Sequence, residues 1–375
     1  MKHGDHAFCI PSIFQKKGRT FSMIRHLTLV LVAFFIVLAV LSSGCGNRVT
    51  GSGGAGRSET AAPSDASASG EAASPDAGTT AGTLPEKLRV GFISANNKET
   101  ITGVEGWAQS KGTLASELKK YGVREIRFIP FPNGPNLNEA LASGSLDVGI
   151  YGDTPAINAR ANGLPTRLIN ISQSGMNAWL IARTDGPKSV AELKGTKVAT
   201  AQGSYMHRYL IGLLEEHGLV GDVKVLHLLP PDGEAALARG DIAAFAYPTG
   251  FGPLMIQKGY AAIDEAARRP DLRGSSVTVA TDKFLEDHPD FPKIWNEIRR
   301  QAVREIREHP DEFYRLYAEA SGYPLDVVKA SFTLEQWPEE DFPEDGLQLL
   351  EGTKTFLVEQ GLARENFDLN DWIYR

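Results

Sequence analysis

The sequence predicts an α/β protein built from two lobes, and three observations lead to this prediction. From residue 88 onward, β-like runs alternate with helical patterns. The same order of elements then occurs a second time, which indicates a second unit of the same kind. A mostly helical tail follows the last β-like run. If that tail packs back on the first unit, residues 85–181 and 277–375 form lobe one and residues 182–276 form lobe two.

The first unit contains three β-like runs and three helical patterns. Short β-branched and aromatic runs favour strands, and a glycine after an apolar periodic stretch marks a helix end. The expected strands are 88–93, 126–129 and 146–151, and the expected helices are 114–121, 136–143 and one that begins at 154. Strands that alternate with helices form βα units, so we expect a parallel sheet.

The second unit and the tail follow the same reasoning. The second unit has expected strands at 196–200, 223–228 and 242–247, and expected helices at 204–216 and 234–239. A last strand at 276–280 precedes expected helices at 291–309, 310–321, 324–331 and 346–360. The chain would then cross between the lobes near 179–183 and near 275–280, and two crossings form a hinge.

The chain before the lobes has the features of an export segment. The apolar run 27–41 follows Arg25 and His26 and leads through small residues to Cys45. It is shorter than the roughly 20 residues that cross a bilayer, which favours a signal over a membrane span. We expect Met23 to be the initiator, with 1–22 an over-extended start and 23–44 the signal peptide. A transmembrane anchor that ends in a lone Cys45 stays open as the alternative.

Small residues followed by a cysteine resemble a bacterial lipoprotein signal, which implies lipidation of Cys45. Residues 46–84 are almost entirely small or polar and include no aromatic residue, so they cannot bury enough apolar surface to fold. We therefore expect 45–84 to be a lipid anchor and a disordered tether. The anchored protein would lie outside the cytoplasm, on the outer face of the cell membrane or on the periplasmic side in a two-membrane bacterium.

Composition excludes several classes of partner. The chain has 39 Lys and Arg against 46 Asp and Glu, a formal net charge of −7, and no basic block. A nucleic-acid-binding surface would need a basic patch, so no nucleic-acid partner is expected. The acidic balance also argues against broad adhesion to anionic lipids. The only membrane contact expected is therefore the lipid on Cys45.

Two strand ends are the candidate binding positions. Ligands of parallel α/β sheets bind beyond the carboxyl ends of strands, where helices begin. The first candidate end contains Gly152, Asp153 and Thr154, with Thr154 as a helix cap, and the second contains Gly203, Ser204 and Tyr205, with Ser204 as the cap. The free N–H groups and partial positive charge of each helix start favour an anion. Each alone could also be an ordinary capped helix.

Further polar and aromatic residues are candidates for the same cleft. Asn96 and Asn97 follow the first strand, Asn177 lies near the first crossing, and Tyr247 ends the last strand of the second unit. Asp153 has no nucleophile or histidine at a recognisable spacing, so it more plausibly binds an amine or supports the helix start. No catalytic residue and no cofactor are expected. No metal site is expected either, because the spacing of the histidines is too wide for a shared ion.

Six short motifs stand out in the segment 88–256: FPNGP at 131–135, LASGSLDVG at 141–149, GDTP at 152–155, LKGTKVA at 193–199, GSYMH at 203–207 and LPPD at 229–232. In these motifs the segment resembles the substrate-binding proteins of ABC importers for nitrate, taurine and aliphatic sulfonates, and the sulfonate branch most of all. One motif departs from the family. Sulfonate binders carry Trp-Asp/Glu-Pro where this chain has Tyr247-Pro248, which leaves the organic end of the ligand open.

The resemblance implies a fold, a site and partners. The fold would be a two-lobed, periplasmic-binding-protein-like fold of type II, a Venus flytrap, with the C-terminal helical tail packed on lobe one. The ligand would be a small anion, an aliphatic sulfonate or taurine, held between the lobes with its head group on the loops 152–154 and 203–205. The implied partners are an ABC permease and its ATPase, and the receptor would be a monomer.

Three alternatives stay open. The same kind of receptor could bind nitrate, bicarbonate or a heterocycle such as a thiamine precursor. An enzyme on the same scaffold is a second class, because cytosolic pyrimidine-precursor synthases resemble this family. Those enzymes use clustered cysteines and a reactive histidine, whereas the only cysteines here are Cys9 and Cys45. A sensory or purely structural surface domain is the third.

Overall fold

The computed structural model describes residues 84–94 and 98–375. Every described residue belongs to one compact unit, Asp76–Arg375. The expected signal, Cys45 and almost all of the tether therefore lie outside the described residues, and so do Asn96 and Asn97.

A mixed five-stranded sheet forms the first lobe. Its strand order is β2-β1-β3-β10-β4, with β2 at Glu125–Phe131, β1 at Lys87–Ile93, β3 at Val148–Gly152, β10 at Gly274–Thr281 and β4 at Thr166–Met176. β1, β2 and β3 are parallel, as the sequence predicted. β10 is antiparallel to both β3 and β4, because it returns from the second lobe. The parallel sheet was predicted from the first three strands, and the sequence set no direction for β10.

The second lobe repeats this arrangement. Its strand order is β7-β6-β8-β5-β9, with β7 at Lys224–His227, β6 at Lys197–Thr200, β8 at Ala244–Tyr247, β5 at Trp179–Ala182 and β9 at Ala261–Glu265. β6, β7 and β8 are parallel, and β5 is antiparallel to its neighbours β8 and β9. In both lobes three parallel strands therefore point their carboxyl ends the same way, which creates an edge where loops gather.

The chain passes between the sheets twice. The first passage, at 177–178, joins β4 to β5, and the second joins β9 to β10 through the short 3₁₀ turns η2 (Ala266–Arg268) and η3 (Pro270–Leu272). The positions expected for these crossings, near 179–183 and 275–280, fall inside strands β5 and β10. Both passages are short and flanked by buried strand residues, so apolar patterning alone could not separate strand from linker.

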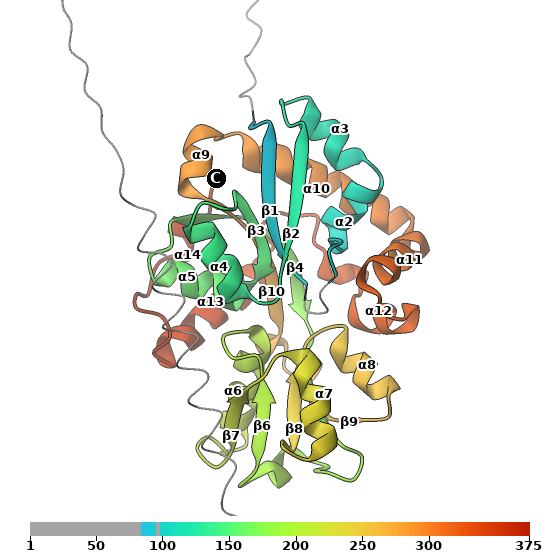
Figure 1. Ribbon diagram of the computed structural model, residues 1–375. Helices are drawn as coiled ribbons and strands as arrows, with labels where there is room; N and C mark the ends of the chain where they lie inside the picture. Colours follow the sequence, from blue (N-terminus) through green and yellow to red (C-terminus); the bar gives the residue numbers. More distant parts are fainter. Residues whose placement is uncertain (1–83, 95–97) are drawn as a thin grey trace, which may run out of the picture. The chain divides into compact units, whose positions relative to one another are not determined.

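Helices cover both faces of each sheet (Figure 1). In the first lobe one face packs against α2 (Gly103–Ser110), α3 (Thr113–Lys119) and α10 (Phe291–Glu308). The opposite face packs against α4 (Gly134–Ala142), α5 (Asp153–Ala161) and α13 (Glu344–Glu359). In the second lobe α6 (Tyr205–Glu216) covers one face, and α7 (Pro230–Arg239) and α8 (Phe251–Gln257) cover the other; η1 (Val190–Leu193) precedes β6.

The C-terminal tail packs mainly on the first lobe. Its elements are α9 (Asp282–Asp287), α10, α11 (Pro310–Ser321), α12 (Leu325–Ser331), η4 (Leu334–Gln336), α13 and α14 (Leu369–Trp372). α10 contacts α2, α3 and β4, and α13 contacts α5, β4 and β10. The tail also reaches the second lobe, because α12 contacts α8 and α13 contacts α6. It therefore bridges the two sheets besides completing the first.

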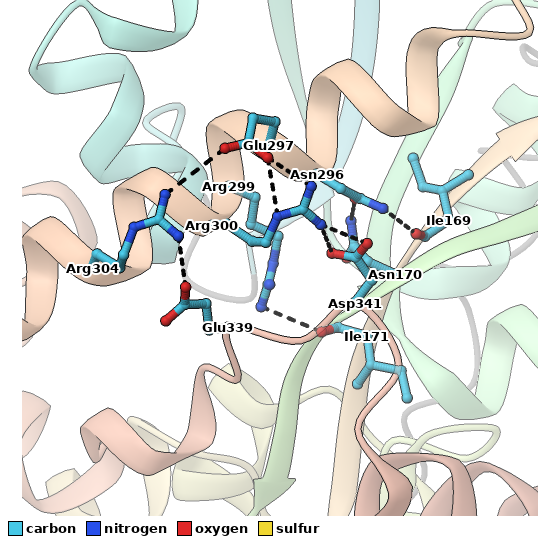
Figure 2. A network of polar contacts seen from close by, with 10 residues as sticks. All are labelled: Ile169, Asn170, Ile171, Asn296, Glu297, Arg299, Arg300, Arg304, Glu339 and Asp341. Carbon is cyan, nitrogen blue, oxygen red and sulfur yellow. Dashed lines mark hydrogen bonds and ion pairs between the residues drawn. The ribbon is translucent and has the colours of Figure 1, made fainter. Parts of the chain in front are cut away.

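A buried polar seam holds α10 against β4 (Figure 2). The Asn296 amide donates to the Ile169 carbonyl at 2.8 Å and accepts from Asn170 at 2.8 Å. Arg299 donates through Nη2 to the Ile171 carbonyl at 3.4 Å and to the Ser172 carbonyl at 3.1 Å. These bonds fix the part of β4 that leads into the interlobe cavity.

Candidate functional site

A cavity of about 460 Å³ lies where the loops of both lobes meet. In the first lobe its wall is made by residues that end or follow β1, β2 and β3, and in the second by residues that follow β6, β7 and β8. These are the carboxyl ends of the parallel strands, which is where α/β sheets bind ligands. The topology therefore brings six strand ends to one cavity.

The start of α6 faces this cavity. Ser204 is its N-cap: the hydroxyl accepts from the His207 N–H at 3.4 Å and donates to the Ala201 carbonyl. Tyr205 and Met206 are the first helical residues, and N–H groups at these positions have no acceptor within a helix. Both residues line the cavity, together with Gly203 and Ser204. The arrangement offers two amide donors and the positive end of a helix dipole to an anion.

Two imidazoles cover the amides just before this helix. His227 accepts the Gln202 N–H on its Nδ1 at 3.1 Å, and His207 accepts the Gly203 N–H on its Nδ1 at 3.5 Å. An imidazole nitrogen can accept only when it is unprotonated. Burial, and secondarily the neighbouring His227, lowers the pKa of His207, which favours that neutral form. Sequence reasoning considered these histidines only as metal ligands and missed this role.

Tyr205 ties the helix start to the first passage between the sheets and to the loop after β8. Its hydroxyl donates to the Asn177 carbonyl at 3.2 Å and accepts from the Thr249 N–H at 3.0 Å. Burial raises the pKa of Tyr205 to about 12. A Cβ added at Gly274 would lie 2.4 Å from the Tyr205 ring, so only glycine allows β10 to pass this close. Tyr205 therefore holds the α6 start in place beside the first passage between the sheets.

The start of α5 differs, because a carboxylate already occupies it. Asp153 is fully buried; its Oδ1 accepts from the Thr154 N–H and hydroxyl, and its Oδ2 accepts from the Ser275 N–H and the Thr353 hydroxyl, each at 3.1 Å. Burial raises the pKa of Asp153, and the charge of Arg208 opposes that rise. Of the three predicted residues only Gly152 lines the cavity. Asp153 therefore supports the helix start, the second of the two roles considered for it.

Asn177 and Tyr247 also lie outside the cavity wall. The Asn177 side chain accepts from the Ala178 and Ala267 N–H groups at 3.0 and 2.7 Å, and thereby joins the two passages between the sheets. Tyr247 is fully buried and stacks on Phe245, with ring centroids 4.2 Å apart. It lies in the core beneath α7 and α8, because its position in β8 turns the side chain to that face.

The C-terminal tail contributes an aromatic wall that the sequence analysis missed. Four rings line the cavity: Tyr317, Tyr323, Phe332 and Trp337. Tyr317 and Phe332 lie with centroids 4.4 Å apart, and Phe332 stacks on Trp337 at 6.4 Å. The density of aromatic residues between 313 and 337 was the available signal. Lys98 and Glu105, from the loop before α2 and from its first turn, also line the cavity.

Metal-binding clusters and membrane-crossing helices are both absent from the part of the chain that the structure describes. No three His, Cys, Asp or Glu side chains come together there in a way that could hold a metal ion. Over the same residues, no helix has the length and apolar character needed to cross a bilayer.

Two curated relatives share the name "Putative aliphatic sulfonates-binding protein". The one from Escherichia coli (strain K12) is 29% identical over 249 residues, which is 65% of this chain and 74% of the relative. The one from Bacillus subtilis (strain 168) is 28% identical over 225 residues, covering 59% of this chain and 68% of the relative. Both are named as binding proteins.

Solved structures confirm the predicted periplasmic-binding-protein-like fold. The periplasmic aliphatic sulphonate binding protein SsuA from Escherichia coli aligns with a TM-score of 0.64 at 25% identity, over 77% of this chain and 98% of SsuA. The desulfurization enzyme DSZB aligns with a TM-score of 0.62 at 17% identity, over 77% of this chain and 96% of the enzyme, so the fold also supports catalysis.

The family model described as "NMT1/THI5 like" matches residues 122–313, slightly more than half of the chain. That match spans the strands and helices which build most of the cavity, from β2 in the first lobe through the whole second lobe to α10. It agrees with the resemblance to nitrate, taurine and sulfonate receptors that the short motifs predicted. The chain belongs to the NMT1/THI5 like family.

Proposed function

We propose that this protein is the extracytoplasmic solute receptor of an ABC importer and binds a small organic anion, an aliphatic sulfonate or taurine, between its lobes. The observation that carries the proposal is the α6 start, whose first helical residues Tyr205 and Met206 line the interlobe cavity. A sulfonate has three equivalent oxygens and needs several donors at once, which a helix start supplies without a charged side chain. The names of the curated relatives support the same ligand class.

The organic end of the ligand would lie against the aromatic wall. Tyr317, Tyr323, Phe332 and Trp337 give that side of the cavity an apolar surface. An alkyl chain gains free energy by leaving water for such a surface, roughly 25 cal/mol per Å² of area buried. In this proposal the tail helices, rather than Tyr247, select among organic ends.

Calorimetric titration of the purified protein tests the ligand class directly. The panel contains ethanesulfonate, propanesulfonate, taurine, nitrate, bicarbonate and a thiamine-precursor pyrimidine. We expect saturable one-to-one binding for the sulfonates and none for nitrate or bicarbonate, which cannot fill the apolar side of the cavity. Binding of the pyrimidine alone would replace the sulfonate proposal, and unchanged sulfonates recovered after incubation would support a receptor over an enzyme.

Lobe closure is part of the proposed mechanism. Ligand contacts from both lobes favour a state in which the cavity is shut, and the two short passages between the sheets provide the hinge. Small-angle scattering should therefore report a smaller radius of gyration at saturating sulfonate. An unchanged profile would indicate a rigid site.

We further propose that Cys45 is lipidated and becomes the N-terminus when residues 23–44 are removed, and that 45–84 tether the monomeric receptor to the membrane beside its permease and ATPase partners. The apolar run and the small residues before Cys45 support this proposal. Labelling cells with a radioactive fatty acid should mark the wild-type protein, whereas Cys45→Ser should remain unlabelled. Purified mature protein that still carries residues 23–44 would contradict it.

A further inference from the structure

Glu105 is a buried carboxylate in the wall of the cavity. It lies in the first turn of α2, is only 7% exposed and lines the cavity. Its Oε1 atom is buried and has no hydrogen-bond partner among the described residues. A buried carboxylate without a partner is costly, since it loses its water and gains nothing in return. Burial accordingly raises the pKa of Glu105.

The nearby buried cation, Arg299, does not supply the hydrogen bond that Oε1 of Glu105 lacks. The charge of Arg299, on α10, opposes the rise in the pKa of Glu105. Its Nη2, however, is held by the carbonyls of Ile171 and Ser172 on β4, as Figure 2 shows for Ile171. Its Nε and Nη1 have no partner within the described chain, and neither does Oε1 of Glu105, so these atoms are not bonded to each other. The charge of Arg299 thus opposes the effect of burial on the carboxyl without filling its hydrogen-bonding capacity.

The surroundings of Glu105 suit a ligand ammonium group. Among the described residues lining the cavity, Glu105 is the only carboxylate, and aromatic rings lie close to the start of its helix. A Cβ added at Gly103 would lie 3.8 Å from Nε1 of Trp337, which places this ring beside the first turn of α2. Carboxylates and aromatic faces are the groups that bind ammonium ions in proteins.

We propose that Glu105 binds an ammonium group on the ligand, so that the receptor selects zwitterionic aminosulfonates over simple alkanesulfonates. The inference rests on the proposed function: the sulfonate lies at the α6 start in the second lobe, and the amine lies at α2 in the first. The ligand then bridges the lobes through two opposite charges. Each charge is matched by a group on one lobe only, which makes closure depend on both ends of the ligand.

Taurine and propanesulfonate form the decisive pair, because an ammonium group in one replaces a methyl group in the other. Calorimetry on the wild-type protein should give taurine at least about a tenfold lower Kd. In Glu105→Gln the affinity for taurine should fall to that for propanesulfonate, whose own Kd should change by less than about threefold. Glu99→Gln is the matched control: this exposed carboxylate lies six residues earlier and is not among the residues lining the cavity, so its variant should keep the preference.

Each other outcome overturns a separate claim. Equal binding of the pair by wild-type protein would refute the role of Glu105 and leave the sulfonate receptor intact. A preference that survives in a folded Glu105→Gln variant would place the amine elsewhere. Binding of neither sulfonate would refute the proposed function itself. Should Glu105→Gln fail to fold, a crystal structure of the wild-type protein with taurine decides: the ligand nitrogen within hydrogen-bond distance of Glu105 supports the inference, and any other position refutes it.

Discussion

The starts of α5 and α6 look alike in the sequence and differ in the structure. Each follows a parallel strand and contains a glycine, but only α6 has a side-chain cap: α5 begins at Asp153 after Gly152, so Thr154 is not the cap that the sequence predicted. At α6 the first helical residues line the cavity. At α5 the buried carboxylate of Asp153 takes the Thr154 N–H and links to Ser275 and Thr353. One helix start is therefore open to an anion, and the other is already occupied by the carboxyl group of Asp153.

The comparison shows that a capping pattern locates a helix start but does not reveal whether a ligand can use it. The charge and burial of the side chains at the helix start decide whether a ligand can bind there. Thr353, which binds Asp153, also accepts from Arg208 of α6 at 3.1 Å, so the α5 start belongs to a buried network that joins both lobes and the tail. We infer that the α5 start serves stability and the α6 start serves binding.

The largest effect is expected from Asp153→Ala, which should destabilise the fold. The change leaves the Thr154 and Ser275 N–H groups without their acceptor and the buried Arg208 without its nearby anion. We expect a loss of about 3 kcal/mol in the free energy of unfolding, measured by urea titration. Asp153→Asn keeps one acceptor oxygen and should lose less.

Ligand affinity of the folded Asp153→Asn protein separates the two roles. If the α5 start serves stability, the Kd for propanesulfonate should stay within about threefold of the wild-type value. Normal stability combined with a strong loss of affinity would show that the α5 start binds the ligand after all.

Gly203→Val should cause the largest loss of affinity, compared with Gly195→Val as a control. Both glycines have a positive φ, 77° and 75°, and open space where a Cβ would lie, so both variants should suffer a similar loss of stability, about 1 kcal/mol. Only Gly203 lines the cavity. Its variant should bind propanesulfonate at least about tenfold more weakly, whereas Gly195→Val should bind normally. Equal affinities of the two variants would move the head group away from α6.

A moderate dependence on pH is expected from His207. Neutral His207 accepts the Gly203 N–H, whereas protonation frees this amide and adds a positive charge near the anion. A sulfonate stays ionised throughout, so affinity should rise several-fold between about pH 8 and pH 5.5. His207→Gln should show a flatter dependence in calorimetry. An affinity of the wild-type protein that decreases as the pH is lowered from about 8 to about 5.5 would contradict this mechanism.

The unliganded protein should respond in the opposite direction. Burial lowers the pKa of His207 in the fold, so the folded state favours the neutral imidazole. Folding stability is then complete above the ordinary pKa of about 6.5 and declines as the pH falls below it. Urea titrations without ligand measure this decline, which His207→Gln should reduce.

The smallest effect is expected from Tyr247→Phe. The Tyr247 hydroxyl is buried and has no hydrogen-bond partner among the described residues. Its removal should therefore change the free energy of unfolding by less than about 0.5 kcal/mol, or slightly stabilise the protein. Preference among sulfonates with different organic ends should not change. A shifted preference would restore Tyr247 as a residue that selects the ligand, as the sequence had suggested.

Local pattern predicted the parallel strands well. β1, β2, β3, β6, β7 and β8 were all expected within a few residues, because each is a short apolar run next to a helix. β4 was missed, since it alternates apolar residues with Asn170, Ser172 and Ser174, which are buried. The Asn170 side chain finds its partner on α10, more than a hundred residues later in the chain. No local signal could have shown that this buried amide is satisfied.

The same limit explains what was missed at the site. The α6 start and its residues Gly203, Ser204 and Tyr205 were predicted, because capping is a local feature. Glu105 and the aromatic wall were not predicted, because whether these side chains line the cavity depends on how α2 and the tail pack together. Tyr247 was assigned to the cavity because the sequence does not reveal which face of β8 its side chain takes.

A crystal structure with bound propanesulfonate, in which anomalous scattering locates the ligand sulphur, tests the central claim most directly. The account predicts the sulphur at the start of α6, with sulfonate oxygens accepting from the backbone N–H groups of Tyr205 and Met206. A head group bound at the start of α5, against Gly152, would contradict it.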